Sequence, residues 1–215
     1  GIADYSYLIA VRSDSSWKGL KDLLAAAKAN PGKYIYGSPG VYSTPQMTFE
    51  DVLDAAGGKM VHVPFKGGTD NVNALLGGHV DVIVGGGSGT LAQLVQEGRI
   101  RILATMNGQR GSDYPDAPTV RELGFNAEAR SPIGLVGPKG LEPSIIARVD
   151  AAVSEGVKSA EFVELMKSVG MPITYMGPKE YDEYAENTFR EEGVRMTRVL
   201  ALEGKKVARA VPDKS

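Results

Sequence analysis

The sequence predicts an α/β fold, and three observations carry that prediction. Short runs of β-branched and aromatic residues alternate with segments whose apolar residues recur at helical spacing. Single helices between strands indicate right-handed crossovers, hence a parallel sheet covered on both faces. Three expected strands are followed by glycine-bearing loops, "GSPGVYST", "PFKGGTD" and "GGGSGT". Ligands of such sheets bind where loops leave the carboxyl ends of the strands, so these loops are the candidate site.

The expected elements follow one another along the chain. The strands are "YSYLIAV", "KYIYG", "KMVHVPF", "VDVIVGG" and "IRILATM". The helices between them are expected at Trp17 to Ala29, Pro45 to Ala56, Thr69 to Leu76 and Thr90 to Glu97. A proline-rich stretch ending in "APTVRELGF" closes this part.

The pattern changes after Ala129, and we place a domain boundary near Arg130. A short strand in "SPIGLVGP" precedes two helical faces, and "ITYM" with a long polar helix from Lys179 follows. The apolar positions of the two faces are Ile145, Ile146, Val149 and Val153, then Phe162, Leu165, Met166 and Val169. So much helix with so little strand makes a poor independent α/β domain. The final stretch, "LEGKKVARAVPDKS", is expected to be a surface end.

Composition narrows the functional classes. The net charge of -2 and the sequence pI near 5.8 argue against a surface built for nucleic acid or anionic lipid. With no cysteine, the chain has no disulfide, zinc-thiolate site or cysteine nucleophile, but this decides no compartment. The chain begins at Gly1, so its first residues say nothing about export.

The stretch "YGSPGVYSTPQMTFEDVL" joins a strand to a helix start. Pro45 suits the first helical position, and the side chain of Ser43 or Thr44 is expected to accept a hydrogen bond as N-cap. The remaining amides would favour an anion, by about 0.3–1 kcal/mol when exposed and up to ~2 kcal/mol when partly buried. The alternative interpretation is a plain capped helix.

Enzyme motifs fail. No loop supplies the Gly-Lys pair of a phosphate-binding loop, and Thr90 stands where both a dinucleotide motif and a nucleophile elbow need glycine. His62 and His79 have no obvious acid or hydroxyl partner at useful spacing, so we expect structural roles for both. Asp81 is expected to bond to nearby backbone amides. The sequence therefore predicts no catalytic residue, no metal site and no cofactor.

Several longer stretches resemble one family. "VHVPFKGGTDNVNALLGGHVDVIVGG", "EGRIRILATM", "YPDAPTVRELGF" and "GLVGPKGLEPSIIARVDAAV" are similar to the tripartite tricarboxylate transporter substrate-binding receptors, the Bug family of periplasmic solute-binding proteins. The resemblance implies a two-lobed, periplasmic-binding-protein-like (type II) fold. Residues 4–129 would form a complete lobe two, and residues 131–215 the C-terminal part of lobe one plus the C-terminal helix. Family members carry roughly a hundred further residues at the N-terminus.

The resemblance implies capture of a small organic acid in the periplasm and its delivery to membrane transporter subunits, with no chemistry and no nucleic acid. A ligand-sensing regulatory domain of the same architecture is the alternative, and an enzyme is the third class. Because lobe one would be incomplete, its helices would keep an uncovered apolar face. We therefore expect self-association through the tail, or repacking of the tail onto lobe two.

Ligand-binding positions follow residue by residue from the resemblance. They are Gly40, Val41, Tyr42, Ser43 and Thr44 in the first loop, Lys66, Gly67, Gly68 and Thr69 in the second, and Gly86 and Gly87 in the third. Ser43 and Thr44 are the main candidates. Tyr42 is larger than the residues usual there and either stacks on the ligand or covers the loop. Lys66 is either a ligand cation or a solvated lysine.

Overall fold

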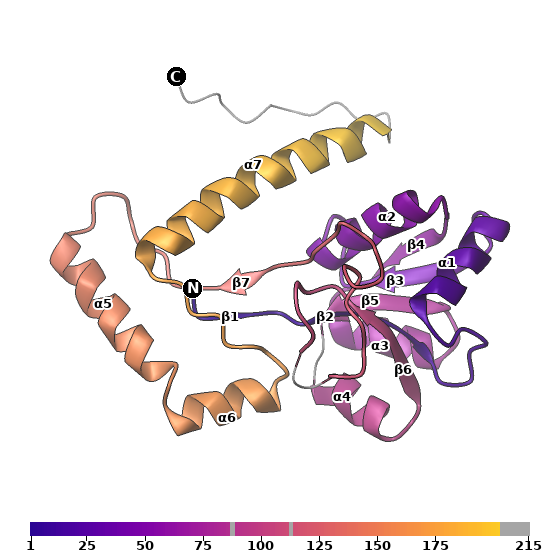
Figure 1. Ribbon diagram of the computed structural model, residues 1–215, viewed down its shortest axis with the longest axis horizontal. Helices are drawn as coiled ribbons and strands as arrows, with labels where there is room; N and C mark the ends of the chain where they lie inside the picture. The colour runs from indigo at the N-terminus through magenta and orange to yellow at the C-terminus, as the bar shows by residue number, and fades with distance from the viewer. Residues whose placement is uncertain (87–88, 112–113, 203–215) are drawn as a thin grey trace.

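The protein is described by a computed structural model covering residues 1–86, 89–111 and 114–202 (Figure 1). Its centre is a five-stranded sheet with strand order β4-β3-β5-β2-β6. The strands are β2 (Tyr7–Arg12), β3 (Ile35–Ser38), β4 (Val61–Pro64), β5 (Val82–Gly86) and β6 (Ile100–Thr105). All five expected strands are present and each is one to three residues shorter than expected, although β2 and β3 end one residue later than expected.

Strand direction differs from the expectation of a parallel sheet. β3, β4 and β5 are parallel, but β2 runs antiparallel to both β5 and β6. The register pairs Tyr7, at the start of β2, with Gly86, at the end of β5. The chain thus enters the sheet at the edge where the parallel strands end, which forces β2 to run the opposite way. Hydrophobic periodicity indicates which residues are buried but not the direction of a strand, so it could not predict this arrangement.

Two pairs of helices cover the sheet. α1 (Leu20–Ala29) and α2 (Thr44–Ala56) share a buried core with one face, while α3 (Gly68–Leu76) and α4 (Gly89–Gln96) pack on the other. Alternation along β2 sends Ile9 to the first core and Leu8 to the second. The result is a three-layer sandwich that buries both faces of the sheet.

A narrow crossing joins this lobe to the rest of the chain. β1 (Ala3–Asp4) pairs antiparallel with β7 (Pro132–Ile133), and an isolated bridge joins Ala3 to Ile173. The buried Asp4 carboxylate accepts hydrogen bonds from the Tyr5 amide at 2.9 Å and the Ser131 amide at 2.7 Å. These bonds fix both passing segments at one point.

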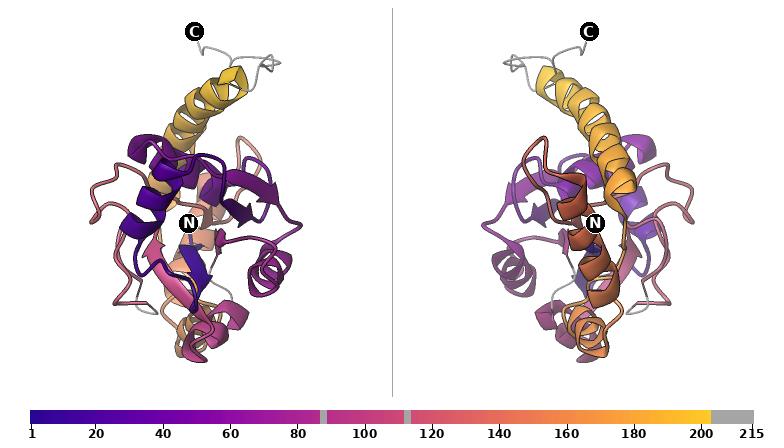
Figure 2. Two further views of the ribbon diagram at one scale, coloured as in Figure 1. Left: turned by 90° about the vertical axis from the view of Figure 1, so that its right-hand side faces the viewer. Right: turned by 90° about the vertical axis from the view of Figure 1, so that its left-hand side faces the viewer.

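Beyond the crossing lie α5 (Pro143–Gly156), α6 (Ala160–Ser168) and α7 (Pro178–Leu202). No residue of α5 or α6 is buried. α7 runs from the crossing back toward the sandwich (Figures 1 and 2), where the Arg195 guanidinium lies 2.6 Å from the Asp51 carboxylate on α2. The C-terminal helix, assigned from the resemblance to lobe one, therefore also contacts the three-layer sandwich. Residues 203–215, the expected surface end, lie outside the described part.

No helix in the part of the chain that the structure describes is long and apolar enough to cross a membrane.

Candidate functional site

The three glycine-bearing loops leave one edge of the sheet. β3 and β4 are parallel with Ser38 opposite Pro64, and β3 and β5 are parallel neighbours, so the loops after all three strands emerge side by side. This confirms that the first two loops and the end of β5 at Gly86 share one edge. Gly87, also a predicted ligand residue, lies outside the described residues.

The start of α2 differs in detail from its expected capping. Ser43 is the N-cap residue, with Thr44 the first helical residue and Pro45 the second. The side chain of Ser43 does not cap the helix; its hydroxyl donates instead to the Gly40 carbonyl at 2.9 Å. The expectation of a side-chain cap is wrong, because this hydroxyl is directed to the Gly40 carbonyl and no first-turn amide donates to its oxygen.

The loop before α2 has an unusual backbone. Tyr42 has φ 58°, the one positive φ among the non-glycine residues that the structure describes. A left-handed conformation costs a side-chain-bearing residue roughly 1–2 kcal/mol. The Tyr42 amide donates to the Gln46 side-chain oxygen at 2.9 Å, which helps hold this turn against the helix. Val41, at the tip, is 55% exposed.

The first turn of α2 presents amides toward the loop. The Tyr42 amide is already bonded to Gln46, while Pro45 has no N–H. Helix geometry leaves the amides of Thr44 and Gln46 without an acceptor inside the helix. These two groups lie at the positive end of the helix dipole, where backbone N–H groups favour an anion.

The second loop supplies another helix start. Gly67 is the N-cap of α3 with φ 107°, a conformation that favours glycine, and Gly68 and Thr69 open the helix at an exposed position. Lys66 is exposed and forms no ion pair with any residue that the structure describes. Asp70 in the first turn carries the opposite charge. Lys66 thus places a cation at this edge.

Sequence reasoning missed Tyr7, which lies where the crossing meets α2. Burial raises the pKa of Tyr7, and hydrogen bonding to the side chains of Ser131 and Thr44 opposes part of the rise. The Thr44 hydroxyl therefore faces the crossing as well as the loop. Tyr7 lies in an apolar strand run, so the pattern indicated only a core residue.

The expectation that His62 has no hydroxyl partner is wrong. Its Nε2 lies 2.8 Å from the Ser38 hydroxyl, because β3 and β4 are parallel neighbours. A serine–histidine pair suggests a nucleophile, but the Ser38 side chain is fully buried and its hydroxyl donates to Gly40 of its own loop. An acyl substrate could not approach it. Burial lowers the pKa of His62, which keeps the ring neutral near pH 7.

Other candidate residues have structural roles. The Asp81 carboxylate accepts a hydrogen bond from the Ile35 amide at 2.8 Å, as expected, and it lies at the opposite end of the strands. Among the residues with a described placement, no cluster of His, Asp and Glu could hold a metal ion.

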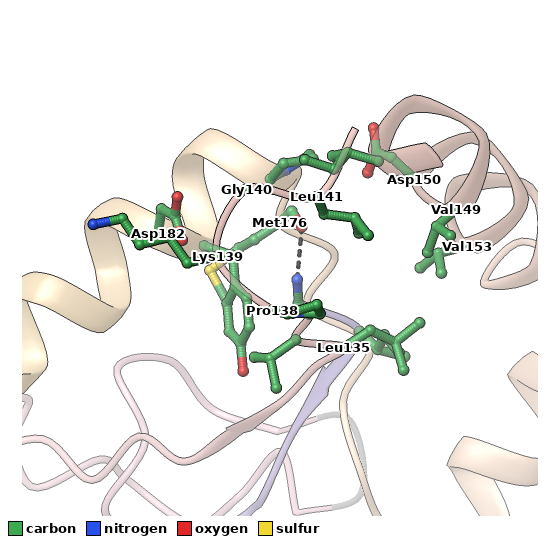
Figure 3. Close-up of a pocket in the computed structure, with 17 residues that line it drawn as sticks. Leu135, Pro138, Lys139, Gly140, Leu141, Val149, Asp150, Val153, Met176 and Asp182 are labelled. Atoms are coloured by element: carbon green, nitrogen blue, oxygen red, sulfur yellow. Dashed lines mark hydrogen bonds between the residues drawn. The ribbon is translucent and has the colours of Figure 1, made fainter. Parts of the chain in front are cut away.

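A separate large cavity lies beyond the crossing. It has a volume of about 760 Å³ and lies between the loop after β7, α5 and the start of α7 (Figure 3). Its labelled walls include Leu135, Leu141, Val149 and Val153, with Asp150 and Asp182 at the rim. Apolar side chains left open in this way are typical of a core that lacks one layer.

Comparison with known proteins decides the family. The family model described as "Tripartite tricarboxylate transporter family receptor" matches residues 1–200. The chain belongs to this family of solute-binding receptors. A receptor-family relative from Cupriavidus necator, "UPF0065 protein in gbd 5'region", is 35% identical over 191 residues, which are 89% of this chain and 58% of the relative. The chain thus spans little more than half of that relative.

Solved receptor structures share the fold. A TctC solute-binding protein from Polaromonas, solved without ligand, is 26% identical with a TM-score of 0.74, over 90% of this chain and 65% of that one. A protein from R. palustris solved with adipate is 22% identical with a TM-score of 0.78, over 94% and 67% of the two chains. The two-lobed receptor fold is confirmed, with one lobe complete and the other partly present.

Proposed function

We propose that this receptor-family chain binds a small organic acid at the edge formed by the ends of β3, β4 and β5. The observation that carries the proposal is the convergence of two helix N-termini and one cation, Lys66, at that edge. Amides at helix starts and a lysine together suit a carboxylate. The adipate in the R. palustris structure supports this class of ligand.

The proposed contacts divide by chemistry. The amides of Thr44 and Gln46 and those of Gly68 and Thr69 would hold carboxylate oxygens directly or through water, which is nearly as favourable. The Ser43 hydroxyl, already bonded to Gly40, would shape the loop more than it contacts the acid. The remaining predicted positions with a described placement, Val41, Tyr42, Gly67 and Gly86, would form the walls.

We propose the lobe division at the crossing, with residues 4–129 as lobe two and 131–215 as part of lobe one. The buried Asp4 and its bond to Ser131 support a boundary at this point. The acid would be captured in the periplasm and passed to the membrane subunits of a tripartite transporter, without chemical conversion. A ligand-sensing regulatory domain is the second candidate. A signal peptide on the full gene product would favour the receptor, and a DNA-binding helix pair the regulator.

The test compares adipate with adipamide, its uncharged diamide of equal length, in thermal unfolding of the 215-residue chain. Adipate should raise the melting temperature in a concentration-dependent way, whereas adipamide should not. Lys66→Gln should weaken the adipate effect several-fold, and Lys167→Gln, an exposed lysine on α6, should leave it unchanged. Equal stabilisation by both compounds, or equal effects of both substitutions, would refute the carboxylate site.

A further inference from the structure

The contact between His62 and Ser38 lies beside the proposed site and does not hold the acid directly. His62 lies in β4 with its ring stacked on Tyr36, at 4.9 Å between ring centroids, and its Nε2 is 2.8 Å from Ser38 Oγ. Ser38 is the last residue of β3, immediately before the loop that leads to α2. A histidine on a neighbouring strand thus contacts the base of this loop.

The bonds of Ser38 continue into the loop. Its hydroxyl donates to the Gly40 carbonyl at 2.8 Å, and the Gly40 amide donates back to Ser38 Oγ at 3.3 Å. The same Gly40 carbonyl accepts the Ser43 hydroxyl at 2.9 Å. Gly40 is therefore the point at which the base and the far end of the loop are tied together.

Counting the hydrogens on Ser38 Oγ and on the His62 ring shows which of the two groups is the donor in their contact. A serine hydroxyl has one hydrogen, and a neutral imidazole has one N–H. If the Ser38 hydrogen points to the Gly40 carbonyl, Ser38 Oγ can only accept from His62, so Nε2 must carry the ring hydrogen. The opposite tautomer would draw the Ser38 hydrogen to the ring and leave the Gly40 carbonyl with Ser43 alone.

We propose that His62, as its Nε2–H tautomer, is a positioning residue that directs the Ser38 hydroxyl to Gly40 and so sets the loop before α2. The structure of that loop explains why it needs support. Tyr42 is held in the left-handed region, and the amides proposed to bind the acid follow directly after it. A loop free to relax at Gly40 would lose this pre-organised arrangement. The part of the inference that concerns affinity rests on the proposed function.

The first test needs no ligand. In the 215-residue chain labelled with nitrogen-15 at histidine, long-range ring correlations report the tautomer of each ring. The ring of His62 should be the Nε2–H form. The chain has one other histidine, His79, and its ring signals are identified because they disappear in His79→Gln. An Nδ1–H form at His62 would overturn the proposal.

The second test uses matched variants. His62→Gln keeps a side-chain N–H at a similar reach, while His62→Phe keeps a ring on Tyr36 but removes the donor. We expect His62→Phe to speed amide exchange at Tyr42 and weaken adipate binding, each by about fivefold, the equivalent of one neutral hydrogen bond. His62→Gln should stay within about twofold of the parent, as should the control His79→Gln.

Ser38→Ala separates positioning from general damage to the fold. It should match His62→Phe, and the double variant should be no worse than either alone, because both break one chain of bonds. Additive losses, or equal losses in His62→Gln and His62→Phe, would overturn the proposal. If no variant binds adipate, the proposed function fails, while the tautomer and the Tyr42 exchange still decide the role of His62.

Discussion

The two sides of the crossing contain helices of similar sequence character in very different surroundings. α2 buries Phe49, Val52 and Leu53 against the sheet, and α3 buries Val72 and Leu75 on the other face. α5 and α6 have apolar stripes of the same kind, yet Ile145 remains 45% and Leu165 53% exposed. An amphipathic pattern indicates that a helix needs a partner surface, but it does not indicate whether that surface is present.

The largest expected difference between the two sides is in stability. Phe49→Ala removes a fully buried ring packed edge-on against Tyr36, with centroids 5.0 Å apart, and should lower the free energy of unfolding by about 3–5 kcal/mol. Leu165→Ala, on exposed α6, should change it by less than about 0.5 kcal/mol. Urea unfolding of both variants measures this contrast. Similar losses would mean that α6 packs in solution against a surface absent from the structure.

The open apolar face should also bring copies of the chain together. Burying an exposed leucine or isoleucine is worth about 1.5–3 kcal/mol, so pairing of α5 and α6 between two chains is favourable. Val149→Glu with Leu165→Glu should therefore shift the chain toward monomer in light scattering. The matched pair Glu155→Gln with Glu164→Gln, exposed on the same helices, should not. A parent chain that is monomeric at high concentration would contradict the prediction.

A smaller effect is expected where α7 meets α2. The Arg195–Asp51 pair is partly shielded, with the side chains 17% and 22% exposed, so Asp51→Asn should cost roughly 1 kcal/mol. Glu192→Gln provides the control, since Glu192 contacts Arg195 from within α7 itself. Chemical unfolding of the two variants separates the link from the local pair. Equal losses would show that α7 gains nothing from its contact with α2.

The smallest effect concerns pH and lies entirely within the three-layer sandwich. Burial lowers the pKa of His62, whose ring faces Tyr36 and, beyond it, Glu50, which is hydrogen-bonded to Tyr36. As the pH falls below about 6.5, His62 is protonated in the unfolded chain at a higher pH than in the folded chain. The stability that neutral His62 contributes to the folded state is thus present above about pH 6.5 and is lost as the pH falls. Stability of the parent should decline more steeply between pH 7 and pH 5 than that of His62→Gln.

How much the sequence predicted also differs between the two sides. In the three-layer sandwich, alternation located every strand and helix to within a few residues, and the glycine loops correctly marked one shared edge. The direction of β2 and the contact between Ser38 and His62 were missed, because both depend on which strands are neighbours and in which register. Beyond the crossing, the helices were predicted from their apolar spacing, but spacing could not show that α7 returns to α2.

The location of acid binding tests the central claim most directly. Amide chemical shifts of the nitrogen-15-labelled 215-residue chain should be followed during titration with adipate. Because Val41, Lys66 and Thr69 leave the edge open to solvent, we expect weak binding, on the order of millimolar. The shifts should concentrate at residues 40–46 and 66–69. Shifts centred instead on the cavity lined by Leu135, Leu141 and Val153, or no saturable shifts at any adipate concentration, would contradict the proposed site.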